Sequence, residues 1–304
     1  MHVPLAEVTR SGFVESRHFG AVVGLDPSGA VALSRGPVDD QVLPRSTAKP
    51  FQALACLAAG APLSGPALAI AAGSHTGQDR HVEVVEKILR EADLTVDALR
   101  CPESWPEDEP TRDALIRAGE KPTRIRMNCS GKHAGMLAGC VSSGWSVDDY
   151  LDPAHPFQAL VRAGVEGLAG ETSAHTAVDG CGAPLFSVTL VGLARAIRGL
   201  ADTPVADAMR AHPEYVGGAG HVNTEVMRLL PGVVAKGGAE GVLVLATAEG
   251  HAVAVKVIDG SPRATTAIGL AALRDLGFDV TAAAEHLSVP VLGGGREVGR
   301  IAPV

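Results

Sequence analysis

The sequence is poor in aromatic residues: only 3% of its 304 residues are Phe, Trp or Tyr. A surface that stacks nucleic-acid bases needs such side chains, and phosphate binding needs clustered Lys and Arg. The chain instead carries 34 Asp and Glu against 26 Lys and Arg, a net charge of -8, with no long run of either sign. We therefore expect neither nucleic acid nor an anionic membrane as a partner.

Long hydrophobic runs are also missing. No apolar stretch approaches the roughly 18 residues that a membrane helix needs, and the first residues, MHVPLAEVTRSGF, lack the basic and apolar regions of a secretory signal. A cytoplasmic location is the resulting expectation. The five cysteines are an odd number in a chain that needs no disulfide staples, so we expect reduced core residues or ligands.

Small apolar residues are abundant, and their patterns predict strands at both ends of the chain. The predicted strands cover residues 17–25, 30–36, 240–259 (two strands) and 296–304, and the predicted helices cover 46–60, 79–94, 130–144, 155–170, 184–202 and 262–277. This segregation predicts an α/β protein of the α+β type, with an antiparallel sheet built from both termini and helices on its faces. We expect a single domain, 1–304, with a helical region at roughly 78–170 inserted between the sheet segments.

Serine and lysine occur in positions that suit nucleophilic catalysis. Ser46 and Lys49 are three residues apart at a helix start, on one face, and a lysine with a pKa lowered by burial can take the proton of a serine hydroxyl. Ser74 lies in the segment GSHTGQ before another helix, and Lys236 stands between a β-branched run and two glycines. Each segment taken alone also fits helix capping or a solvated lysine.

Two glycine-flanked turns carry the soft ligands. Cys129 lies four residues before His133 and three before Lys132, so either spacing places a pair on one helical face. Asp179 and Cys181 lie in the turn DGCGAP, where glycine lets the backbone approach a ligand closely. Core and capping roles remain the alternative for the first segment, and a plain tight turn with Asp179 as its hydrogen-bonding residue is the alternative for the second.

Six blocks occur in order along the chain: VESRHFGAVVGLD, RSTAKPFQAL, GSHTGQDRHV, NCSGKHAGML, DGCGAP and AKGGAEGV. Together they resemble the L-asparaginase II family, the Rhizobium-type thermolabile asparaginases, over nearly the whole chain. The resemblance implies a fold like that of serine β-lactamases and penicillin-binding proteins, a homodimer, and hydrolysis of L-asparagine to L-aspartate and ammonia.

The match of motifs also implies roles for single residues. The implied catalytic residues are Ser46 with Lys49, and Ser74 with Lys236. The implied zinc ligands are Cys129, Lys132 and Cys181, with water as the fourth, although spacing alone would favour His133. The implied substrate-binding residues are Arg45, Asp179 and His133.

The chain departs from the family pattern at one place. Cys101-Pro102-Glu103-Ser104-Trp105-Pro106 stands where relatives carry Cys-Gly-x-His-x-Pro, which affects the loop there and the fit of the substrate. Three other activities stay open at this point. They are hydrolysis by zinc-bound water, glutaminase or β-lactamase activity on the same fold, and silent binding of an amino acid.

Overall fold

The computed structural model describes residues 1–304, and its centre is one eight-stranded antiparallel sheet. The order is β11-β12-β1-β2-β10-β9-β8, with β3 paired to β2 beside this path. The strands are β1 (Val3–Arg10), β2 (Phe13–Leu25), β3 (Val31–Arg35), β8 (Val233–Gly238), β9 (Val242–Thr247), β10 (Ala252–Val257), β11 (Val289–Gly293) and β12 (Arg296–Pro303). β1 lies between β2 and β12, so the two ends of the chain meet in the sheet, as expected.

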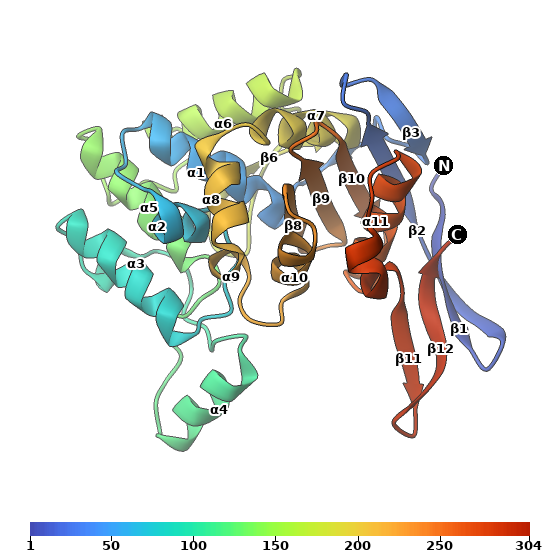
Figure 1. Cartoon of the computed structure of the whole chain (residues 1–304). Helices are drawn as coiled ribbons and strands as arrows, with labels where there is room; N and C mark the ends of the chain where they lie inside the picture. Colours follow the sequence, from blue (N-terminus) through green and yellow to red (C-terminus); the bar gives the residue numbers. More distant parts are fainter.

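Two helices cover the middle of this sheet. α7 (Leu190–Leu200) and α11 (Thr265–Asp275) both pack against β2, β9 and β10. α7 also contacts the helical region, whereas α11 lies on the opposite, outer face (Figure 1). Because both faces are covered, every residue of β9 is buried and its sequence VLVLAT shows no alternation.

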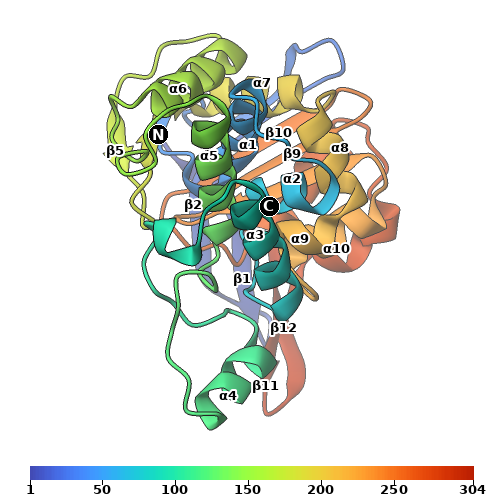
Figure 2. The same cartoon turned by 90° about the vertical axis from the view of Figure 1, so that its left-hand side faces the viewer.

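The remaining helices form a layer beside the sheet. They are α1 (Lys49–Ala58), α2 (Gly65–Ala71), α3 (Asp79–Glu91), α4 (Glu109–Arg117), α5 (Ser130–Ser142), α6 (Pro156–Ala169), α8 (Pro204–Ala211), α9 (Pro213–Val216) and α10 (Val222–Leu229), with 3-10 turns at Arg45–Ala48, Val96–Ala98 and Thr281–Leu287. α5 contacts α1, α2 and α3, so it lies in the middle of this layer. Figure 2, viewed from the helical side, shows α4 extending away from the rest.

The small side chains of α5 explain its central position. Gly131, Gly135 and Gly139 follow one another at four-residue spacing on one face. An added Cβ at Gly131 would lie 2.7 Å from the backbone oxygen of Ile70, and one at Gly139 would lie 3.0 Å from the Phe157 ring. The glycines therefore let neighbouring helices approach closely, as a core poor in large side chains requires.

One expected helix is wrong in part. Residues 184–202 were predicted as helical throughout, but β6 (Pro184–Phe186) pairs with β5 (Thr176–Val178), and β7 (Val188–Thr189) pairs with β4 (Gln41–Val42), before α7 begins. Thr189 is the N-cap of α7 and accepts from the Gly192 N–H. The short apolar run before it fits a buried strand as well as a helix, so periodicity alone could not separate them.

The buried hydrophobic residues form one core of 79 members that reaches from the sheet into the helical layer. Helices occur from α1 to α10, well beyond the predicted insertion at 78–170. None of the helices is long and apolar enough to cross a membrane.

Candidate active site

Three lysines are almost completely buried. Lys49 and Lys132 are each 1% exposed and Lys236 is 0% exposed. Lysine is almost never fully buried unless partners hold it, because removing its charge from water is costly. All three belong to the motifs selected from the sequence, so their burial marks a common functional centre.

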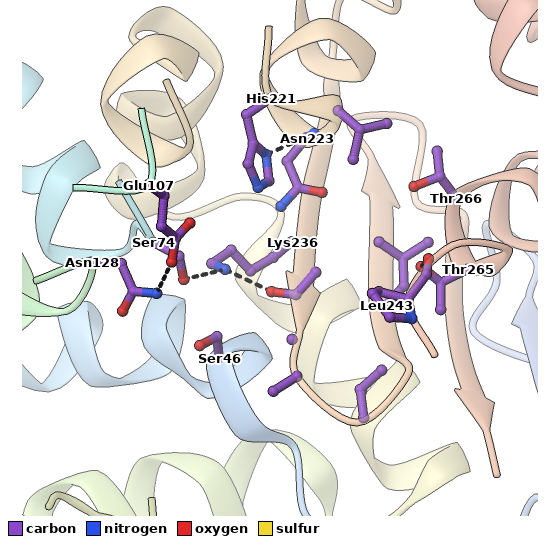
Figure 3. A pocket seen from close by; sticks show the side chains of 16 residues that line it. Ser46, Ser74, Glu107, Asn128, His221, Asn223, Lys236, Leu243, Thr265 and Thr266 are labelled. Atoms are coloured by element: carbon purple, nitrogen blue, oxygen red, sulfur yellow. Dashed lines mark hydrogen bonds between the residues drawn. The ribbon is translucent and has the colours of Figure 1, made fainter. Parts of the chain in front are cut away.

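Two of these lysines meet at one hydroxyl. Lys49 Nζ lies 2.7 Å from Ser74 Oγ, and Lys236 Nζ lies 3.0 Å from the same oxygen. Lys236 Nζ also reaches the Gly237 carbonyl at 2.7 Å, and Lys49 Nζ reaches the Asn128 carbonyl at 3.3 Å. The structure thus joins Lys49, Ser74 and Lys236 into a continuous chain of hydrogen bonds, which Figure 3 shows in part.

The electrostatics of this chain favour a neutral amine. Burial, together with the positive charge of Lys49, lowers the pKa of Lys236 well below its usual 10.5. No carboxylate contacts Lys236 Nζ; its partners are a hydroxyl and a carbonyl. A buried amine of this kind can accept a proton at a pH where an exposed lysine cannot.

Backbone hydrogen bonds from two directions hold the loop that carries Ser74. The Ser74 N–H donates to Val216 O at 2.7 Å, and the Thr76 N–H donates to Gly217 O at 2.8 Å. The N–H of His75, between them, donates to Asn128 O at 3.2 Å. Segments distant in sequence therefore fix the position of the serine.

Ser46 lies at the other side of the same cavity, on the 3-10 turn that leads into α1 (Figure 3). Its hydroxyl makes no hydrogen bond, so the expected Ser46–Lys49 pair is not joined directly. The preceding residue, Arg45, has a φ of +51°, which is unusual for a residue with a side chain and is typical of functional sites. The backbone before Ser46 is thus held in a strained turn.

Two backbone N–H groups beside Ser46 have no acceptor in the protein. One is the N–H of Ser46 itself and the other is that of Ala239, just after β8. Gly238 allows this approach: a Cβ added there would lie 3.2 Å from Ser46 N and 3.1 Å from Pro44 O. Free N–H donors next to a serine are the elements of an oxyanion hole.

These groups surround a cavity of about 370 Å³. Its lining residues that bear on the chemistry below are Ser46, Ser74, Glu107, Asn128, His221, Asn223 and Lys236. The cavity lies at β8, which is the edge strand of the sheet, so its backbone groups remain available to a ligand.

The predicted metal ligands come together in a second, adjacent cluster. Lys132 Nζ lies 2.9 Å from Cys181 Sγ, and Cys129 lies close enough to Cys181 for the two thiols to shift each other's pKa. Their interaction lowers the pKa of Cys129 well below its usual 9.0 and raises the pKa of Cys181. Burial acts to lower the pKa of Lys132, but its interactions with Cys129, Cys181 and Asp179 outweigh burial and raise it.

This donor set fits a zinc ion in its chemistry. Two thiols, one of them with a pKa well below its usual value, and one amine converge in a buried place, and thiolate is a preferred ligand of zinc. No group of three or more His, Cys, Asp or Glu side chains forms a metal cluster, so the lysine is needed to complete the set. Cys101, also buried, lies near Cys129, and burial raises its pKa to about 12.

The three residues expected to bind substrate lie outside the lining of the cavity. Arg45 Nε donates to Asp179 Oδ1 at 2.9 Å, which ties the turn before Ser46 to the turn of Cys181. His133 is fully buried, with Nδ1 2.6 Å from the Tyr150 hydroxyl and with Nε2 lacking any partner. None of the three lines the 370 Å³ cavity, and their roles stay predictions.

Four of these seven cavity residues had no place among the sequence-based candidates: Glu107, Asn128, His221 and Asn223. Glu107 follows the segment Cys101–Pro106 that departs from the family pattern. His221 and Asn223 follow GGAG and open a helix, which is the glycine-then-helix signal that drew attention to Ser74, so it could have found them.

Comparison with known protein families identifies the family of this chain. The family model for L-asparaginase II matches residues 6–303. The chain belongs to the L-asparaginase II family, which supports an amide-hydrolysing enzyme of the asparaginase type.

Solved structures resemble this chain at low sequence identity. A β-lactamase from Mycobacterium bovis is 15% identical, with 91% of this chain and 96% of that chain covered and a TM-score of 0.41. Simvastatin synthase from Aspergillus terreus, as a mutant, is 9% identical, with 88% and 92% covered and a TM-score of 0.39. No significant match was found among curated protein sequences.

Proposed function

We propose that the protein hydrolyses the side-chain amide of L-asparagine to L-aspartate and ammonia, with Ser46 as the nucleophile. Family membership supports the reaction class. The observation that carries the mechanism is the chain Lys49–Ser74–Lys236, which ends in the cavity that Ser46 lines.

In the first half of the proposed reaction, Lys49 passes a proton through Ser74 Oγ to the amine of Lys236 and then accepts the proton of Ser46, whose Oγ attacks the amide carbon. The N–H groups of Ser46 and Ala239 stabilise the oxyanion, since they are free and already fixed in place. Catalytic hydrogen bonds are commonly long before substrate binds, so the open Ser46–Lys49 gap is compatible with this step.

The proton then moves from Lys49 through the Ser74 hydroxyl to the amide nitrogen, and ammonia leaves. The result is a β-aspartyl ester of Ser46. A water molecule attacks this ester, its proton returns through the same relay to Ser46 Oγ, and L-aspartate is released. Lys236, close to Ser74 Oγ at 3.0 Å, orients that hydroxyl and adjusts its proton affinity.

We also propose that Cys129, Lys132 and Cys181 hold a zinc ion. When bound, the zinc supplies a positive charge that attracts the polar end of the substrate. On the protein side, Lys132 must lose its proton, so binding should strengthen as the pH rises. Arg45, paired with Asp179, connects this cluster to the turn of Ser46.

The decisive experiment measures how the acyl-enzyme divides between reaction with water and reaction with hydroxylamine. With L-asparagine and increasing hydroxylamine, an ester on Ser46 yields β-aspartyl hydroxamate in proportion to hydroxylamine, while ammonia release continues. Ammonia release from L-glutamine and D-asparagine, measured in parallel, tests the substrate. Ser46→Ala should abolish both products. A folded Ser46→Ala protein that still forms hydroxamate would assign the nucleophile elsewhere, with Ser74 first.

The resemblance further leads us to propose a cytoplasmic homodimer. Light scattering of the purified chain tests the assembly: a mass of one chain of 31.0 kDa would contradict it.

A further inference from the structure

The side chain of Asn223 is buried without a partner. The residue is 3% exposed, yet neither its amide oxygen nor its amide nitrogen makes a hydrogen bond in the protein. The amide lies on the cavity, opposite Gly237 and beside Lys236 (Figure 3). The residue lines the cavity and its amide atoms remain accessible from there, so a ligand in the cavity can complete their hydrogen bonds.

The amide stands at the start of α10, an eight-residue helix. Helix starts carry unpaired N–H groups and a partial positive charge. The N–H of Val222, another lining residue, has no acceptor in the protein. Anions are favoured at such a position when further donors converge on it.

His221, the N-cap of α10, adds a donor. Its Nδ1 accepts the Asn223 N–H at 3.2 Å, so the neutral ring carries its proton on Nε2. Burial, together with the charges of Lys236 and Lys49, lowers the pKa of His221 to about 4, which keeps the ring neutral near pH 7. The ring also lines the cavity.

The opposite side of the cavity is acidic. Glu107 accepts from Asn128 Nδ2 at 2.6 Å through Oε1, and its other oxygen makes no hydrogen bond. Figure 3 shows Glu107 and Asn128 at one side of the Ser74–Lys236 pair and Asn223 at another. The cavity thus has donors at one side and a carboxylate at the other, the polarity that a free α-amino acid requires.

From this arrangement we propose that the start of α10, through Asn223 and His221, binds the α-carboxylate of the substrate, and that Glu107 binds its α-ammonium group. The assignment rests on the proposed amidase function and specifies its substrate class: free amino-acid amides rather than asparagine within a peptide. The energetic reason is that Asn223 and His221 lose their acceptor when the carboxylate is blocked, and Glu107 loses its donor when the ammonium group is blocked.

A crossed comparison of blocked substrates tests this assignment. Ammonia release is measured on L-asparagine, on its α-(N-methylamide), which lacks the carboxylate, and on N-acetyl-L-asparagine, which lacks the ammonium. Ammonia from either derivative comes only from the side chain. The variants are Asn223→Ala, Asn223→Asp and Glu107→Gln, with Glu225→Gln as the control, because Glu225 lies on the same helix but pairs with Arg228.

Asn223→Ala should raise KM for L-asparagine about tenfold or more, as expected for a lost hydrogen bond to a charged group. Its preference for L-asparagine over the methylamide should shrink by the same factor, while its preference over the N-acetyl compound stays. Glu107→Gln should show the reverse pattern. Asn223→Asp, which keeps the shape but adds a negative charge, should raise KM further, and this variant decides the matter if Asn223→Ala does not fold.

The assignment would be overturned if folded Asn223 variants kept both the KM for L-asparagine and the preference for L-asparagine over its methylamide. It would also be overturned if every variant lost its preference over the methylamide and over the N-acetyl compound to the same extent. Failure of the proposed function looks different: the wild-type protein would then release ammonia from none of the amides. In that case calorimetry with L-aspartate decides the inference, since weaker binding to Asn223→Ala than to wild type supports it and equal binding overturns it.

Discussion

Replacing Lys236 by methionine separates catalysis from stability. The side chain keeps roughly its volume but loses the amine next to Ser74 Oγ and the Gly237 carbonyl. Because the relay loses the group that orients Ser74, we expect kcat/KM for L-asparagine to fall by about 10² to 10⁴, the range typical of a lost acid–base group. The wild-type rate should rise with pH as Lys236 loses its proton, and this rise should disappear in Lys236→Met.

The stability of the wild type should also rise with pH. The pKa of Lys236 is lowered by burial, so between this lowered value and about 10.4 the unfolded chain binds one more proton than the folded one. The unfolding free energy of the wild type therefore rises with pH in this window, by up to about 1.4 kcal/mol per pH unit. This stabilisation is fully present above the pKa of Lys236 in the unfolded chain, and it is lost as the pH falls to the pKa of Lys236 in the folded protein.

The variant lacks this dependence. Its two lost hydrogen bonds cost about 1–3 kcal/mol together, and the removed desolvation of the amine offsets about 1.4 kcal/mol for each unit by which the pKa was lowered. The unfolding free energy of the wild type minus that of the variant should therefore increase as the pH rises, whatever this difference is at pH 7.

Urea unfolding at four pH values between 7 and 10 measures this difference. Lys236→Gln serves as the matched control, because it retains a hydrogen-bonding group but cannot titrate. The difference in unfolding free energy between wild type and Lys236→Gln, plotted against pH, should have the same slope as the difference between wild type and Lys236→Met. Parallel curves for wild type and both variants would show that Lys236 does not titrate in this window, and the account of its buried amine would be wrong.

Three further predictions concern the surroundings of this amine. Ser46→Ala should abolish turnover while leaving the urea midpoint close to that of the wild type, and full turnover in the folded variant would refute Ser46 as nucleophile. Gly238→Ala should lower kcat by about tenfold to hundredfold, because its Cβ would press on Ser46 N at 3.2 Å and small displacements of reacting groups are costly; kinetics equal to wild type would count against a fixed oxyanion site. Elemental analysis should find about one zinc per chain, lost in Cys129→Ser and Cys181→Ser but kept in Cys56→Ser, and retention in Cys181→Ser would show that the ligand set is wrong.

Five of the eight strands of the main sheet, β2, β3, β9, β10 and β12, and several of the helices could be predicted from the sequence. The apolar runs at both ends predict the sheet, since 240–259 became β9 and β10 and residues 296–304 became β12. The amphipathic pattern of 79–94 predicts α3. These features depend on local periodicity, which the chain carries in itself. The run at 184–189 failed because its few apolar residues fit two structures, and pairing with β5 and β4 decided between them.

The partners of the reactive side chains could not be predicted in the same way. Spacing paired Ser46 with Lys49, but a backbone fold that joins residues 74, 128 and 216 brings Ser74 to Lys49 instead. The glycine-rich turn before His221 and Asn223 could have drawn attention to them, but their burial and unfilled hydrogen bonds, which point to ligand binding, are visible only in the structure. Residue types and their order determine which chemistry is available, because they are local properties of the chain. Which groups meet, and which are deprived of water, depends on contacts between distant segments, and these exist only in the folded protein.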